Sequence, residues 1–149
     1  MSKTYGLPGV RLGFIYSCNK KLISNISLKV PIWNLNSMAE FFMEIILKNK
    51  RALESSIEKT KIDRDRFINS LNELEFVEKA YNSGANFVLF KTNSKLKLID
   101  LIDNLIQNHS IYIKDVSNKF NSKINTYFRV AVRTPKDNNM LIKILHNVQ

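Results

Sequence analysis

The chain has 149 residues, of which 44% are hydrophobic and 24% charged, a composition typical of one folded globular domain rather than of a disordered or fibrous chain. No apolar run approaches the roughly 20 residues that span a bilayer, and the N-terminus lacks the basic-then-apolar layout of a secretion signal, so we expect a cytoplasmic protein without membrane contact. The formal net charge of +10 would suit nucleic acid, but the cations are scattered among 13 acidic residues without a basic stripe, and we therefore expect no nucleic-acid partner.

Cysteine and histidine are too few to suggest a metal centre or a thiol enzyme. Cys18 is the single cysteine, so an internal disulfide is impossible, and His109 and His146 lie far apart in the sequence. Metal ligands normally recur at short spacings, and a catalytic thiol needs a base beside it. We therefore expect no metal site, and we expect Cys18 to be a packed or half-exposed thiol.

Glycine is concentrated near the N-terminus, where residues 2–14, "SKTYGLPGVRLGF", hold three of the four glycines. Such clustering marks backbone that takes positive φ or comes very close to another group. Residues 11–17 then predict a short buried strand. Residues 19–30 predict a polar loop and a short piece that is either helical or irregular. Pro31 predicts a boundary there, because proline disfavours helix in the residue before it.

The next segment has the periodicity of a long helix. Ser37 and Glu40 form a capping-box pattern, and apolar residues recur at helical spacing as far as Leu74, so we expect one long helix or two that nearly join. Between Lys48 and Arg66 the charges are mixed in sign, which indicates a largely solvated outer face. Such a helix commonly bridges two lobes.

Shorter elements alternate in the last part of the chain. We expect strands over residues 85–90, 110–115 and 125–133, a helix capped by Ser94 between the first two, and a last helix starting at Thr134. The apolar residues that the last helix is predicted to bury are Met140, Leu141, Ile144, Leu145 and Val148. The predicted fold class is α+β, a short sheet with helices packed on it.

The strand "NTYFRVAVR" has one apolar and one basic face. Because side chains alternate along a strand, Phe128, Val130 and Val132 share one face, while Arg129 and Arg133 point away from the core. A guanidinium in that position can bind a carboxylate or a phosphate, or it can simply be solvated.

The N-terminal segment places a lysine and an arginine around its glycines. Ser2, Lys3 and Arg11 lie in backbone that could close around a small anion. The lysine precedes the glycines, which differs from the phosphate loop of nucleotide hydrolases. A lysine near an arginine-bound phosphate can form a Schiff base with an aldehyde cofactor.

The segment 2–14 resembles the lysine motif S-K-x-x-G-[LV]-x-G-x-R-x-G of fold-type-I aminotransferases that use pyridoxal 5′-phosphate. Further segments resemble, in the same order, those of the histidinol-phosphate aminotransferase group: "PIWNLNSMAEFF", "SGANFVLF", "IYIKDVSNKF" and "YFRVAVRTPKDNNMLIKIL". Three residues depart from that group. Trp33 replaces a tyrosine or phenylalanine, Lys114 stands where many members have arginine, and Arg133 stands where they usually have glycine. "IWNLNS" and "VAVRT" look closer to aminotransferase domains of bacterial surface-polysaccharide pathways.

The resemblance implies a role for six residues. Lys3 would be the Schiff-base lysine and would then act as acid and base in the proton shift. Ser2 and Arg11 would hold the cofactor phosphate, and Arg129 would receive the substrate carboxylate. Asn34 and Asn36 would lie near the substrate at the domain junction.

The resemblance also implies that the chain is the C-terminal portion of a longer enzyme. Residues 1–34 would be a remnant of the large cofactor-binding domain, 35–74 the long interdomain helix, and 75–149 the small C-terminal domain. The expected partners are an amino acid or amino-phosphate substrate, the missing large domain of the same gene product, and a second copy in a homodimer. The family's aspartate for the pyridine nitrogen is absent. We therefore expect pyridoxal 5′-phosphate in the full-length protein, but weak or no binding of it and little activity in the chain alone. We also expect apolar surface exposed around "GFIY" and "PIWNL".

Two other functions remain open from the sequence. Phosphoserine- or threonine-phosphate-type decarboxylases that use the same cofactor are similar in this half of the fold, so the chain could belong to a lyase. A non-enzymatic basic binding module, in which Lys3 and Arg11 have lost their roles, is the third possibility.

Overall fold

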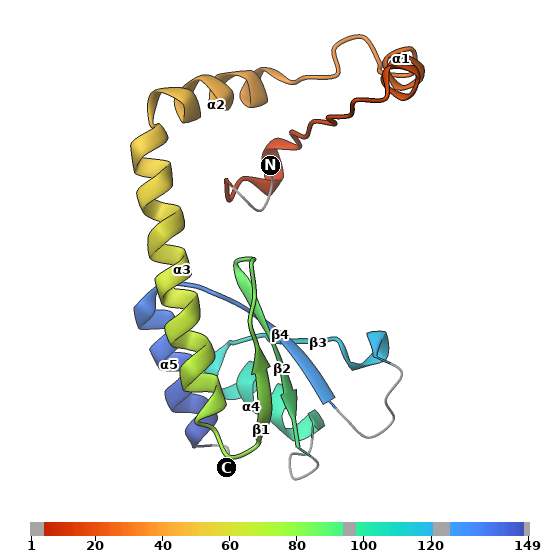
Figure 1. Cartoon of the computed structure of the whole chain (residues 1–149). Helices are drawn as coiled ribbons and strands as arrows, with labels where there is room; N and C mark the ends of the chain where they lie inside the picture. Colours follow the sequence, from red (N-terminus) through yellow and green to blue (C-terminus); the bar gives the residue numbers. More distant parts are fainter. Residues whose placement is uncertain (1–4, 94–97, 121–125, 148–149) are drawn as a thin grey trace. The chain divides into compact units, whose positions relative to one another are not determined.

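The structure is a computed structural model that describes residues 5–93, 98–120 and 126–147 (Figure 1). The chain divides into two compact units, Met1–Ile57 and Glu58–Gln149. Within the described residues, no helix is both long and apolar enough to cross a membrane.

The first unit is built from short helices and extended chain. Its elements are η1 (Pro8–Val10), α1 (Lys20–Ser27), α2 (Ser37–Lys48) and the beginning of α3 (Lys50–Asn72). Of the two forms predicted for residues 19–30, helical or irregular, the structure shows the helix, α1. The long helix is two helices, α2 and α3, separated by Asn49 alone, which is one of the two predicted forms.

The buried strand predicted over residues 11–17 is wrong. These residues form no strand, and the side chains of Phe14 and Tyr16 are 81% and 84% exposed. Their apolar composition indicates burial, but a strand also needs a neighbour for its backbone N–H and C=O groups. No other strand is present in the described part of this unit. The predicted exposure of apolar surface around "GFIY" and "PIWNL" is confirmed, since Ile32 and Trp33 are also exposed.

The cap of α2 differs from the predicted capping box by one residue. Asn36 has extended backbone, and its Oδ1 accepts the N–H of Ala39 at 2.9 Å. Ser37 is therefore already the first helical residue. An asparagine caps as well as a serine does, so the residue with the extended backbone takes the role.

The second unit is a four-stranded antiparallel sheet with helices, so the α+β prediction is confirmed (Figure 1). After α3 come β1 (Val77–Tyr81), β2 (Phe87–Thr92), α4 (Leu98–His109), β3 (Lys114–Asp115), η2 (Ser117–Lys119), β4 (Thr126–Ala131) and α5 (Pro135–His146). The strand order in the sheet is β1-β2-β4-β3.

Strand β1 was not predicted, and β3 is much shorter than the predicted strand over 110–115. β1 exists through long-range pairing with β2, and Asn72 Oδ1 accepts the N–H of Ala80 at 2.7 Å. The N–H groups of Ser110 and Ile111 close the end of α4 by donating to Ile106 and to Leu105. Those two residues are therefore not available to a strand.

The core of the second unit lies between one face of the sheet and helices α3, α4 and α5. The helices contribute mainly leucines, and the strands contribute Val77, Ala80, Val88, Phe90, Phe128 and Val130. The Phe90 and Phe128 rings stack with centroids 5.3 Å apart. The predicted apolar face of β4 is thus confirmed.

The start of α5 is also as predicted, because Thr134 caps it and Pro135 is its first residue. Leu141 and Leu145 are buried, but Met140 is 48% exposed, so its predicted burial is wrong. Met140 lies one residue away from the stripe that faces the core. Ile144 is partly buried against the core, and Ser94 and Val148 lie outside the described residues.

Candidate functional site

The glycine-rich segment bends sharply at two positions. The positive φ predicted from the glycine clustering is found at Gly6 (φ 66°) but not at Gly9 or Gly13, and Arg11 itself is left-handed at φ 56°. The exposed Arg11 guanidinium donates from Nη1 to the Pro8 carbonyl at 3.2 Å. A Cβ added at Gly6, Gly9 or Gly13 would meet no described atom within 4 Å, so the described residues leave this segment open on its glycine side.

Asn36 joins this segment to the start of α2. Its Nδ2 donates to the Val10 carbonyl at 3.0 Å, while its Oδ1 caps the helix. Two of the predicted site residues, Arg11 and Asn36, therefore lie on segments that contact each other. Ser2 and Lys3 lie outside the described residues, and their predicted roles stay predictions.

The charge of residues 1–39 favours an anionic ligand. Residues 1–39 contain five lysines and arginines and no aspartate or glutamate. An exposed guanidinium on left-handed backbone fits the phosphate of pyridoxal 5′-phosphate. No carboxylate in residues 1–39 could pair with the ring nitrogen, so this stretch fits only the phosphate end of the cofactor.

Arg129 lies on the face of the sheet that is opposite the core. This open face carries Phe87, Leu89, Tyr127 and Arg129, and none of these four residues belongs to the core cluster. The Arg129 guanidinium carbon lies 5.0 Å from the centroid of the Phe87 ring. Stacking on a ring favours one orientation of the planar guanidinium, which leaves its N–H fork available to an anion.

Lys114 stands directly opposite Arg129 in the β3–β4 pairing. Both side chains are exposed, and neither forms an ion pair with any acidic residue that the structure describes. Like charges at opposed strand positions repel each other, and an anion bound between them would relieve that repulsion. The sequence showed Lys114 only as a departure from the family, since its place opposite Arg129 depends on strand register.

Lys91 lies on the same face of the sheet as Arg129 but already has an acidic partner. It contacts Glu78 at 2.5 Å, and this hydrogen bond raises the pKa of Lys91. Lys114 and Arg129 are therefore better candidates than Lys91 for a bound anion.

Arg133 is held at the junction between β4 and α5. Its Nε donates to Asp137 Oδ2 at 3.1 Å, and its backbone N–H and C=O both bond the buried amide of Asn138 at 3.0 Å. The hydrogen bond from Arg133, followed by that from Thr134, lowers the pKa of Asp137. The Arg133 side chain thus stabilises the junction between β4 and α5, at a position where the histidinol-phosphate aminotransferase group usually has glycine.

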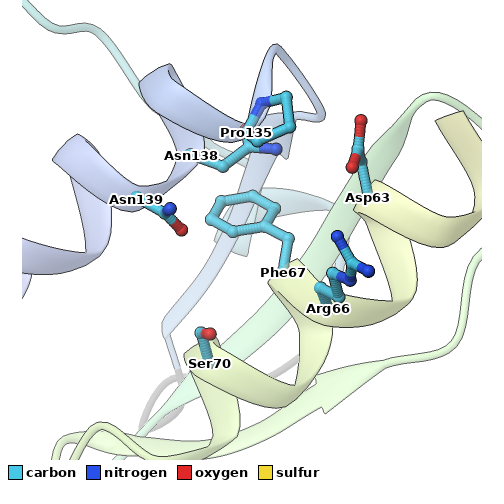
Figure 2. A pocket seen from close by; sticks show the side chains of 7 residues that line it. All are labelled: Asp63, Arg66, Phe67, Ser70, Pro135, Asn138 and Asn139. Carbon is cyan, nitrogen blue, oxygen red and sulfur yellow. The ribbon is translucent and has the colours of Figure 1, made fainter. Parts of the chain in front are cut away.

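A small pocket lies between α3 and the start of α5 (Figure 2). It is lined by Asp63, Arg66, Phe67, Ser70, Pro135, Asn138 and Asn139, and it measures about 90 Å³. Ligand sites usually measure roughly 300–1,000 Å³. None of the predicted site residues lines this pocket, and its size fits a packing defect rather than a substrate site.

Comparison with known proteins covers the chain from end to end. The sequence profile of the family described as aminotransferase class I and II matches residues 1–145. The chain is 33% identical over 148 residues to the adenosylcobalamin biosynthesis bifunctional protein CobDQ of Leptospira interrogans, a match that covers 99% of this chain and 17% of that protein. It is 28% identical over 151 residues to the L-serine phosphate decarboxylase of Sulfurospirillum multivorans, covering 99% of this chain and 38% of that enzyme.

A solved structure gives the same result for the fold. The crystal structure of the histidinol-phosphate aminotransferase from Clostridium acetobutylicum matches with a TM-score of 0.86 and 29% sequence identity. The match covers 97% of this chain and 42% of that chain. The chain thus spans less than half the length of each of these three proteins.

Proposed function

Because this chain belongs to the class I and II aminotransferase family and corresponds to a fragment of a fold-type-I enzyme, we propose that it is the C-terminal part of a pyridoxal-phosphate enzyme that transfers an amino group. The substrates would be an amino acid or amino-phosphate compound and a keto acid. The observation that carries this proposal is the cation pair of Lys114 and Arg129 on the open face of the sheet.

Arg129 is proposed to bind the substrate carboxylate. Its stacking on Phe87 and its lack of an ion pair with any described acid support this role, because a bidentate guanidinium–carboxylate contact needs a fixed and unoccupied N–H fork. Lys114 adds a second positive charge for a substrate with another anionic group, such as a phosphate. Asn36 is proposed to lie near the substrate, where its amide links the glycine-rich segment to α2.

The N-terminal residues are proposed to hold the cofactor. Ser2 and Arg11 would bind its phosphate, and Lys3 would bind its aldehyde through Nζ and later carry the proton of the amino-transfer step. Pyridoxal phosphate, when bound, supplies the electron sink for breaking bonds at the substrate α-carbon. The support for this assignment is the acid-free charge of residues 1–39 and the exposed guanidinium of Arg11.

The remaining part of the enzyme is proposed as the partner of the first unit. Ala39 is the one described residue of this unit that is buried, whereas Phe14, Ile32 and Trp33 are more than four-fifths exposed. Trp33 also has a left-handed backbone at φ 63°, a conformation that costs a large residue about 1–2 kcal/mol. We propose that a cofactor-binding large domain of the same gene product covers this surface in a homodimer, with domain boundaries after residues 34 and 74.

A decarboxylase is the second candidate, and the match to an L-serine phosphate decarboxylase favours it. A phospho-amino acid carries both a carboxylate and a phosphate, which would suit the two cations on the open face. The two activities differ in their products. A decarboxylase releases carbon dioxide and needs no keto acid as co-substrate. An aminotransferase that is given no keto acid completes only the first half of its reaction and then stops.

Reductive trapping tests the cofactor assignment on the chain as it exists. We would mix the chain with pyridoxal phosphate, reduce with borohydride so that the cofactor is fixed to its lysine, and map the labelled peptides. Lys3→Ala is the test variant, and Lys20→Ala, in the same acid-free stretch, is the matched control. Selective labelling that disappears only in Lys3→Ala is the expected result. Equal labelling of many lysines, unchanged in Lys3→Ala, would contradict the assignment.

A further inference from the structure

Strand β3 is held on β4 by side-chain as well as backbone hydrogen bonds. Its two residues pair with Arg129 and Phe128, and the next N–H, that of Val116, donates to the Tyr127 carbonyl at 2.9 Å. So short an edge strand has little backbone pairing of its own. It also places Lys114 against Arg129, whose positive charges repel each other. Something further must keep this strand in register.

The Ser117 hydroxyl supplies that further link. The N–H of Tyr127 donates to Ser117 Oγ at 2.9 Å, so a side-chain oxygen takes the place that a backbone carbonyl would have in a longer strand. The same hydroxyl donates to Asp115 Oδ1 at 2.5 Å, and the Ser117 N–H donates to that oxygen at 2.8 Å. Because the hydroxyl hydrogen of Ser117 points to Asp115, a lone pair of the hydroxyl oxygen is left to face the Tyr127 N–H on β4.

The geometry points to Ser117, fixed by Asp115, as a positioning residue that keeps Lys114 opposite Arg129 and so sets the spacing of the cation pair for an anionic group. This inference rests on the proposed function, because it assumes that the pair receives such a group. Ser117 is not proposed to touch the substrate. Its hydroxyl contacts Asp115 and the β4 backbone. These contacts affect ligand binding only indirectly, because they fix the register of β3 against β4.

The variant Ser117→Ala removes the hydroxyl and keeps the backbone. Ser117→Thr keeps the hydroxyl and serves as the rescue. Ser83→Ala is the matched control, because Ser83 Oγ also accepts a backbone N–H, that of Ala85 at 3.1 Å, but in the turn between β1 and β2.

The first readout needs no ligand. Amide hydrogen exchange of Val116 and Tyr127 and the cross-strand NOEs between Lys114 and Arg129 report the β3–β4 pairing directly. We expect Ser117→Ala to speed exchange at these two amides about tenfold, the size of one hydrogen bond, and to weaken the NOEs. Ser117→Thr and Ser83→Ala are expected to match the wild type. Unchanged exchange and NOEs in Ser117→Ala would overturn the inference.

The second readout is a titration with inorganic phosphate, followed through the Nε–H signal of Arg129. Ser117→Ala is expected to weaken phosphate binding by about threefold or more as the cation pair loses its spacing, and Ser117→Thr is expected to restore it. Equal weakening in Ser117→Ala and Ser83→Ala would mean a general loss of structure and would overturn the inference.

The failure of the proposed function gives a different result. Arg129→Met tests the anion site itself and is expected to abolish the titration. If phosphate binding is absent, or is unaffected by Arg129→Met, the proposed anion site is wrong, whereas the exchange and NOE data still decide whether Ser117 holds the strand. If Ser117→Ala does not fold, Asp115→Asn replaces it, and wild-type exchange at Tyr127 in that variant would overturn the role of Asp115.

Discussion

Arg133 and Asp137 form an ion pair at the point where β4 leads into α5. The hydrogen bond from Arg133 is the largest cause of the lowered pKa of Asp137, and the hydrogen bond from Thr134 at the helix start is the second. A carboxyl whose pKa is lower in the folded than in the unfolded chain stabilises the fold above its ordinary pKa of 3.8. That contribution is lost as the pH falls through the folded value.

The variant Arg133→Gln is expected to raise the pKa of Asp137 toward its ordinary value, because it removes the charged donor. NMR titration of the Asp137 carboxyl carbon measures this shift. The stability difference between variant and wild type should be present at neutral pH and vanish as the pH falls through the lowered folded pKa of Asp137, below which the carboxyl is protonated in both proteins. Lys136→Gln is the control, because Lys136 is the last cause of the shift. A larger change in Lys136→Gln than in Arg133→Gln would contradict this assignment.

At the scale of elements, the end of α4 shows how one residue stops a helix. Ser110 has φ 54°, and its N–H donates to the Ile106 carbonyl at 3.1 Å, the five-residue closure that usually has glycine in the left-handed position. A serine there pays a steric cost that glycine avoids. The closure also ends the helix before β3 and so limits the length of that strand.

We expect Ser110→Gly to stabilise the second unit by about 0.5 kcal/mol, the relief of the left-handed conformation minus the greater freedom of glycine in the unfolded chain. Urea unfolding should show a higher midpoint with an unchanged slope. Ser110→Ala keeps the steric cost and is the control. A midpoint that falls in Ser110→Gly would show that Ser110 makes a favourable contact that outweighs its strain.

Local periodicity made some elements predictable, and long-range pairing made others unpredictable. The two faces of β4 follow from alternation alone, so Arg129 could be assigned to the open face before the structure was known. β1 depends on its pairing with β2, and its sequence has Glu78 and Lys79 at its centre. The place of Lys114 depends on a register fixed by a serine hydroxyl. The periodicity of the sequence does not indicate this register.

At the scale of the whole molecule, the two units differ in what holds them together. The second unit has a core of leucine, phenylalanine and valine side chains from three helices and the sheet. In the first unit the described residues bury Ala39 alone, and α1 has eight residues, whereas an isolated helix shorter than about 12–15 residues is marginal in water. Residues 11–17 were mispredicted for the same reason, since their composition fits an interior that this unit does not have.

Hydrogen exchange of the whole chain is expected to separate the units. Amides of α1 should exchange nearly as fast as unfolded peptide, while those of β2 and β4 should be protected by roughly 10³-fold or more, as in the core of a stable domain. Strong protection of α1 would contradict this expectation and would mean that another molecule covers the first unit. Repeating the measurement over a dilution series would then tell whether that molecule is a second copy of the chain.

Cys18 provides a site for specific labelling of the first unit. It is the single cysteine of the chain, it is exposed rather than packed, and its Sγ lies 4.0 Å from the hydroxyl of the exposed Tyr16. A maleimide dye would therefore attach at one known place, beside the apolar residues 14–16, without any engineered substitution. Quenching or anisotropy of that dye would report the arrival of a covering domain in real time, and the unlabelled sheet of the second unit would stay undisturbed.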